Sequence, residues 1–209
     1  MSQRHVRCLV TVPAAVLAAV LGVTAALAAA TWAVKPGGSL LLKSGSFIVK
    51  DPRTGASFTC AASAMGGTIK RGSGLPGGDI GSVQLVSFST CTNAFDTGTR
   101  YVLTPRDLPW HLNAASYDST TRVVAGTINH IHVTVLGPAC DVAIDGTSAT
   151  AGNGLVRFTY SNTTGALNIL RSGGTLHFWG TCSPFSSNGD PATWSATDTV
   201  SPKETITSP

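Results

Sequence analysis

Short runs in which apolar and polar residues alternate recur along the whole chain, and this pattern constrains the fold more than any other feature. In one run, Val156, Phe158 and Tyr160 share a parity that is apolar throughout. Alternation of this kind is typical of a strand with one buried face, and clusters of Gly, Asn, Asp, Ser and Pro between runs indicate turns. We expect strands near 39–50, 57–62, 81–90, 100–104, 110–116, 121–136, 140–145, 154–160, 165–171, 175–181 and 192–200.

Composition agrees with an all-β chain. Charged residues make up 11% of the 209 residues, against roughly 25% in average globular proteins. Glu occurs once, at Glu204, so the chain lacks a residue that commonly fills exposed helix faces. The sequence predicts an antiparallel β-sandwich, with a closed β-barrel as the alternative. Segment 154–181 is predicted to form a three-stranded meander, and the glycine-rich segment 66–81 an exposed loop.

Two segments break the period of two in the same way. The apolar positions step by three residues from Val83 to Val86 and again from Ile128 to Ile131. An extra residue inserted into a strand produces this step, so we expect a β-bulge in each segment.

The N-terminus has the pattern of an export signal. Arg4 and Arg7 precede an uncharged apolar stretch over 8–30 that ends in small residues. A basic start, an apolar run and a small-residue end are typical of a secretory signal peptide. We expect a signal peptide over 1–28, a single domain over 29–200 and a C-terminal tail over 201–209. The alternatives are a retained N-terminal membrane anchor and a tail in which Ile206 docks as a short edge strand.

The cysteines fit an exported protein. Removal of the signal leaves Cys60, Cys91, Cys140 and Cys182, and an even number of cysteines in an exported chain indicates two disulfides. Three connectivities exist, and we favour Cys60–Cys91 with Cys140–Cys182, because sequential pairing links neighbouring strands. The cysteine spacing does not match a zinc–thiolate site.

Charge and motifs exclude several functions. After removal of 1–28, twelve basic residues face ten acidic ones, and the basic residues are scattered, so we expect no nucleic-acid partner and no further membrane span. Segment 72–77 fits G-x-G-x-x-G, but Pro76 prevents the helix that a dinucleotide site needs. Asp141 and Asp145 lie about 13 Å apart along one strand, too far for the carboxylate pair of a glycosidase. We expect no cofactor.

The histidines are the strongest candidates for chemistry. His130 and His132 stand at i and i+2, and on a regular strand these positions point to one face, as in some zinc sites. A third ligand would come from His111, His177 or a nearby Asp. The competing interpretation is an ordinary solvated face, because Ile131 and its neighbours on the opposite parity are apolar.

The tryptophans are candidates for binding. Trp110, Trp179 and Trp194 lie in predicted strands, where an exposed aromatic face can stack on sugars and a buried one fills the core. The expected partners are a cell-envelope polymer or a small apolar ligand. The leading hypothesis is a secreted or cell-surface, non-enzymatic structural or binding protein. The alternatives are a carrier that holds an apolar ligand inside a barrel and a metal-dependent hydrolase that uses His130 and His132. The oligomeric state stays open.

The chain also resembles a group of small secreted proteins of high-GC Gram-positive bacteria. The residues that carry the resemblance are strand and turn signatures, namely Trp110, Tyr117-Asp118, Gly126-Thr127-Ile128, Cys140 to Gly146, Tyr160 to Leu167, Gly189 to Ala192 and the end over 201–209. The resemblance implies export from an actinobacterium and a shared fold. It supplies no functional residue.

Overall fold

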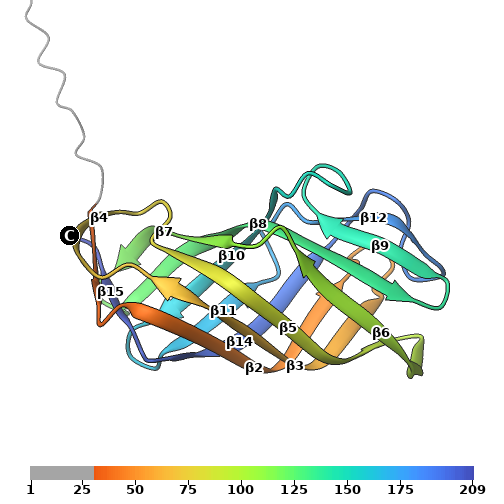
Figure 1. The fold of residues 1–209 in the computed structure, drawn as a ribbon, viewed down its shortest axis with the longest axis horizontal. Helices are drawn as coiled ribbons and strands as arrows, with labels where there is room; N and C mark the ends of the chain where they lie inside the picture. The colour runs from red at the N-terminus through yellow and green to blue at the C-terminus, as the bar shows by residue number, and fades with distance from the viewer. Residues whose placement is uncertain (1–30) are drawn as a thin grey trace, which may run out of the picture.

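The computed structural model describes residues 31–209, with every side chain except those of Asp96 and Thr97, and this part of the chain contains no helix (Figure 1). Consequently no helix within 31–209 is long and apolar enough to cross a membrane. The predicted signal peptide over 1–28, and the anchor that is its alternative, lie outside the described residues.

Eight antiparallel strands pair in a closed ring. In ring order they are β10 (Gly154–Ser161), β11 (Ala166–Leu170), β14 (Thr193–Ser201), β2 (Gly38–Lys50), β3 (Ser57–Ile69), β5 (Gly81–Asn93), β7 (Trp110–Asp118) and β8 (Val123–Gly137), and β8 pairs again with β10. The strands of the front layer cross those of the back layer (Figure 1). The predicted all-β antiparallel fold is confirmed. Because the ring is closed, hydrogen bonds join its two facing layers on both sides.

Strand β8 is fifteen residues long and extends beyond the ring. Its second half pairs with β6 (Asp96–Arg106) and β9 (Cys140–Asp145); β9 pairs with β12 (His177–Cys182), and β12 with β13 (Asp190–Pro191). This extension forms the right-hand end of the molecule in Figure 1. Phe185 packs against Phe58 at 4.1 Å and against Phe178 at 5.3 Å between ring centroids, so the extension shares a core with the ring.

A small sheet closes the opposite end of the molecule (Figure 1). Its strands, in the order β15 (Thr205–Thr207), β1 (Thr31–Lys35) and β4 (Gly72–Pro76), are antiparallel. Ile206 is buried, so the tail docks as an edge strand, which was the alternative for 201–209.

The expectation of an exposed loop over 66–81 is wrong. Strand β3 continues to Ile69 and β4 begins at Gly72. A Cβ atom on Gly67 would collide with the carbonyl group of Ser82 on the neighbouring strand. The glycine at this position permits close backbone approach within the sheet, so Gly67 belongs to a paired strand and not to a loop.

The predicted meander over 154–181 is only half correct. Strands β10 and β11 form the expected hairpin, but the third strand, β12, pairs with β9 and not with β11. The second edge of β11 is occupied by β14, which arrives from later in the chain. Local sequence cannot show that a distant strand takes an edge.

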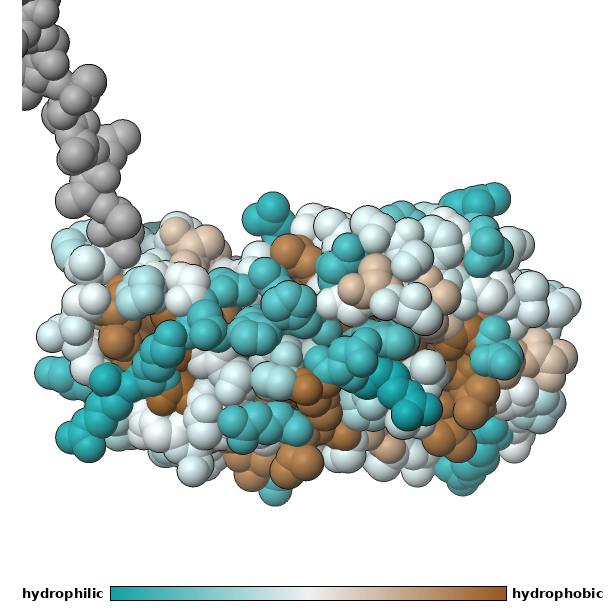
Figure 2. Space-filling model, turned by 45° about the horizontal axis from the view of Figure 1, so that its top comes forward, coloured by the Kyte–Doolittle hydropathy of each residue, from teal (hydrophilic) through white to brown (hydrophobic). Residues whose placement is uncertain are grey.

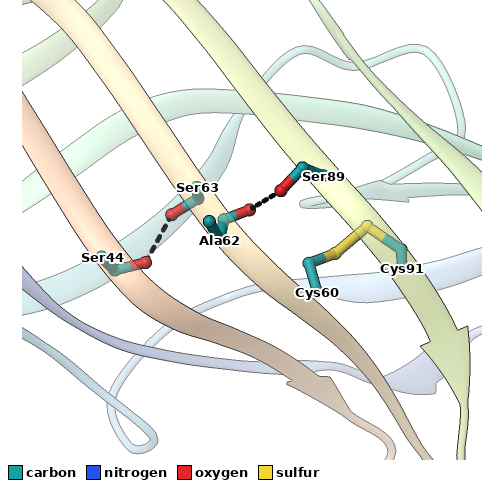
Figure 3. The surroundings of a disulfide bond; sticks show 6 residues. All are labelled: Ser44, Cys60, Ala62, Ser63, Ser89 and Cys91. Atoms are coloured by element: carbon teal, nitrogen blue, oxygen red, sulfur yellow. Dashed lines mark hydrogen bonds between the residues drawn. A yellow bond between two sulfur atoms is a disulfide. The ribbon is translucent and has the colours of Figure 1, made fainter.

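Both predicted disulfides are present. Cys60 and Cys91 lie directly opposite each other on β3 and β5, and Cys140 lies opposite Cys182 on β9 and β12. All four cysteines are buried. Figure 3 shows the first bridge beside a second cross-strand contact, in which the Ser89 hydroxyl donates to the Ala62 carbonyl oxygen at 3.4 Å.

Both predicted bulges are confirmed. The pairing of β3 with β5 shifts register between Gly66 and Gly67, which face Leu85 and Val83. The pairing of β8 with β10 shifts where Ile131 and Asn129 face Gly154 and Leu155, and this leaves His130 as the inserted residue.

Three buried polar side chains form a row across the core. Asp198 on β14 lies opposite Ser44 on β2, and Ser44 lies opposite Ser63 on β3. The two serine hydroxyls are 2.8 Å apart, as drawn in Figure 3, whereas neither carboxylate oxygen of Asp198 has a hydrogen-bond partner within 31–209. Burial raises the pKa of Asp198 to about 7, because a charged carboxylate is poorly solvated there.

Tyr160 fixes the C-terminal segment to the core. Its buried hydroxyl donates to the Glu204 carbonyl oxygen at 2.7 Å and accepts from the Glu204 backbone N–H at 2.9 Å. Burial also raises its pKa to about 12.

Tyr160→Phe is therefore expected to lower the free energy of unfolding by about 2 kcal/mol, because two buried backbone groups lose their partner. Urea unfolding measures this loss. The control is Tyr117→Phe, which removes a half-buried hydroxyl that makes no hydrogen bond within the described chain and should change stability by less than about 0.5 kcal/mol. Equal losses in the two variants would contradict the assigned role.

Candidate functional site

Two of the three tryptophans proposed for binding belong to the core. Trp110 and Trp194 are buried and pack edge to face with ring centroids 5.8 Å apart, and Trp194 also packs against Phe47 at 4.7 Å. Their alternation within β7 and β14 places them on the inward parity. The binding interpretation is therefore wrong for these two residues. Trp179 is half-buried, on the outward parity of β12.

Trp179 belongs to a row of outward side chains that crosses four strands. Trp179 lies opposite Ala143 on β9, Ala143 opposite Thr134 on β8, and Thr134 opposite Thr104 on β6. Directly opposite residues in adjacent strands present their side chains on the same face. The Thr134 hydroxyl donates to the Thr104 carbonyl oxygen at 3.4 Å.

Two large aliphatic side chains lie beside this row. Val102 on β6 and Leu136 on β8 are direct cross-strand partners, and their exposed fractions are 61% and 46%. We call the outward side chains of this face the outer platform; it consists of Val102, Thr104, Thr134, Leu136, Ala143 and Trp179. In Figure 2, hydrophobic side chains reach the surface in separate clusters, one of them at the right-hand end, where the extension lies.

A carboxylate–imidazole cluster borders the platform. His132 Nδ1 is 2.6 Å from Asp107 Oδ2 and 4.0 Å from Asp145 Oδ2. Asp145 is fully buried and accepts backbone N–H groups from Gly146, Gly152, Asn153 and Gly154 at 2.6–3.1 Å. These bonds hold the loop between β9 and β10 against the sheet.

His177 and Trp179 contact the backbone of the same loop. His177 Nδ1 lies 3.0 Å from the Gly146 carbonyl oxygen, and the Trp179 indole N–H donates to that oxygen at 3.3 Å. The structure thus brings His132, His177 and Trp179 together around one loop. His177 and Trp179 contact its backbone, and His132 faces Asp145, which anchors it.

The predicted pairing of His130 with His132 is wrong. His130 is the bulge residue of β8, with a φ of +65°, and its side chain is exposed, whereas His132 is buried. The bulge re-aims the side chain of His130, whereas His132 faces Asp107, so the two imidazoles do not point to one site. His130 instead contacts His111 on β7, with ring centroids 4.7 Å apart.

Catalysis at His132 would need a reacting group at its second nitrogen. His132 Nε2 is buried and has no hydrogen-bond partner within 31–209, so the hydroxyl or thiol of a nucleophile–base pair does not reach it there. Among the described residues, no three His, Cys, Asp or Glu side chains converge in the manner of a metal centre. What the cluster does chemically is fix a loop beside the outer platform.

Sequence reasoning missed Asp107 and the role of Asp145. Asp107 has a φ of +53° in the turn between β6 and β7, and nothing local marks it as the partner of a histidine 25 residues away. Asp145-Gly146 has the sequence of a tight turn, and an aspartate followed by glycines was the available signal for a loop anchor.

Two cavities lie against inward side chains of the ring. An apolar cavity of about 30 Å³ lies near the small sheet, lined by Leu112, Phe158 and Ile206 among others. A second cavity, of about 170 Å³, is lined by Val156, Leu176 and Trp194 among others. Both volumes lie below the 300–1,000 Å³ of sites for small organic ligands. The fold and the site define the molecule as an all-β protein held by two disulfides.

A comparison with known protein families gives a match over most of the chain. The model of a family described as alkane oxidation protein activator PraA/PraB-like matches residues 5–207, and the chain belongs to this family. No curated protein matches the chain. No solved structure matches it either.

Proposed function

We propose that the protein is an exported, non-enzymatic binding protein that contacts an apolar partner through the outer platform. The observation that carries this proposal is the exposure of Val102 and Leu136 side by side, on the face that also carries Trp179. Contiguous apolar side chains at the surface are typical of interaction sites. The small volumes of the two cavities, about 30 and about 170 Å³, support contact at the surface over a carrier with an internal ligand.

Export is supported by two features of the chain. Two buried disulfides form and persist in oxidising compartments. The sequence over 1–28 has the signal-peptide pattern. Origin in an actinobacterium, which the sequence resemblance implies, belongs to the same proposal.

The partner we propose is a long-chain hydrocarbon phase. The family description associates its members with alkane oxidation. Aliphatic side chains with neighbouring threonine hydroxyls suit a hydrocarbon–water boundary, because one part of the face leaves water while the other stays hydrated. The flanking Asp141 and the half-buried Trp179 favour a second candidate, a polysaccharide of the cell envelope, because aromatic rings stack on sugars.

Partition of the full chain onto n-hexadecane droplets tests the first candidate. The double variant Val102→Ser/Leu136→Ser is expected to bind at least about tenfold more weakly, since burying two such side chains contributes roughly 2–3 kcal/mol. The matched control is Leu41→Ser/Leu85→Ser, which removes two exposed aliphatic side chains from the outward face of β2 and β5.

Three outcomes decide the proposal. A loss confined to the platform variant supports it. Equal loss in both double variants, or none in either, contradicts it. Retention of the wild type on chitin, cellulose or peptidoglycan, abolished by Trp179→Ala and absent on hexadecane, would replace the hydrocarbon with a polysaccharide.

A further inference from the structure

The bulge on β8 turns a histidine toward a neighbouring strand. His130 occupies the left-handed region, with a φ of +65°, which is uncommon for a residue with a side chain. Bulges re-aim side chains, and this one leaves the exposed His130 ring against His111 of β7 at an interplanar angle of 76°. Two imidazoles from adjacent strands thus lie together on the surface.

His111 is also fixed by a carboxylate. Its Nδ1 lies 2.7 Å from Asp79 Oδ1, and Asp79 is held in turn by its backbone N–H, which donates to the Asn113 side-chain oxygen at 2.7 Å. A carboxylate on one imidazole nitrogen orients the ring and raises the basicity of the other nitrogen, as is typical of metal-binding histidines. No hydrogen bond within the described chain engages His111 Nε2.

A potential oxygen donor adjoins the pair. Asn129 precedes His130 and lies directly opposite His111 in the pairing of β7 with β8. Its carboxamide oxygen is buried and has no hydrogen-bond partner within 31–209. Lys70 is paired with the other oxygen of the same carboxylate: its Nζ is 3.8 Å from Asp79 Oδ2, whereas His111 faces Oδ1.

We propose that His111 and His130 bind a divalent transition-metal ion, with Asp79 as the positioning carboxylate. Imidazole ligands suit Cu²⁺, Zn²⁺ and Ni²⁺, and the order of affinities for such ligands places Cu²⁺ first. Two protein ligands leave the remaining coordination positions to water, so the site is open and exchangeable. The site is distinct from the outer platform and does not depend on the proposed function.

The test is calorimetric titration of the untagged full chain with Cu²⁺ and with Zn²⁺, together with amide spectra recorded at substoichiometric Cu²⁺. One ion per chain is expected at this site, with selective broadening of amides around Asp79, His111 and His130. His130→Gly should weaken binding at least tenfold without lowering the thermal midpoint, because glycine adopts the positive φ without strain. Asp79→Asn should weaken it by a factor of about ten.

His177→Gln is the matched control, because it removes a half-buried imidazole elsewhere and should leave the affinity unchanged. Unchanged affinity in both His130→Gly and His111→Gln would overturn the proposal. So would broadening that maps only to His5 or His177, or binding of Mg²⁺ as strong as that of Cu²⁺. A loss in His130→Gly alone, with His111→Gln unchanged, would also reject the pair as the site.

Discussion

Replacing Asp198 with Asn is expected to raise the free energy of unfolding by about 4 kcal/mol at pH 8 and to change it by less than about 1 kcal/mol at pH 4. The reason is the burial that raises the pKa of Asp198 to about 7 in the folded protein. Between the unfolded pKa near 4 and the folded value, the native state holds a proton that the unfolded chain has released. The contribution to stability is thus complete at acid pH and is lost as pH rises to about 7.

Urea unfolding of both proteins from pH 4 to pH 8 measures this difference, and subtraction of the two curves cancels the other titrating groups. Asp118→Asn is the control with the opposite sign. Hydrogen bonds from Thr121 and Thr120 lower the pKa of Asp118, so its contribution is present at neutral pH and is lost as pH falls. A difference between wild type and Asp198→Asn that does not vary with pH would refute the assignment.

The second large effect concerns the bridge beneath the outer platform. Cys140→Ala/Cys182→Ala is expected to lower the free energy of unfolding by about 4 kcal/mol, because a crosslink that closes a loop of this size restricts the unfolded chain. It should also speed amide exchange in β9 and β12, the two strands that the bridge joins.

Cys60→Ala/Cys91→Ala is the matched control, since its crosslink spans a separation of 31 residues against 42. A similar loss of unfolding free energy is expected. The amides of β9 and β12 should nevertheless exchange more slowly in this variant than in Cys140→Ala/Cys182→Ala. Faster exchange of β9 and β12 in both variants to the same extent would show that the two bridges act only through global stability.

Alternation predicted the fold class because inward and outward residues of a strand differ in hydropathy whatever its partner. Alternation did not predict which strands pair with each other, because β12 pairs with β9 and β14 pairs with β2, strands that are distant in the sequence. Asp198 was detectable in principle, because it shares the parity of Trp194 and Val200 within β14 and so points inward. A polar residue flanked by threonines looks exposed unless that parity is followed through.

The candidate site was only partly predictable. Trp179 alternates with the apolar Phe178, so parity puts the two on opposite faces, and the structure places Trp179 on the outward one. Trp110 shares the apolar parity of Leu112, and Trp194 shares that of Val200, so the same rule separates these two residues from Trp179. The bulge at His130 was predicted from the step between Ile128 and Ile131, but that step does not show that the inserted side chain turns toward His111. Asp107 lies in a turn, where side chains do not alternate between two faces and their direction cannot be predicted from the sequence.

The two ends of the molecule carry different structural features. Thr31 and Ser208 meet at one of them, where the Ser208 hydroxyl donates to the Thr31 carbonyl oxygen at 3.0 Å, and the strands of the outer platform lie at the other (Figure 1). Any anchor, domain or fusion partner joined before Thr31 or after Pro209 attaches at the first end. Tethered in that way, the protein would hold the strands of the outer platform away from the point of attachment, with the length of the molecule between them.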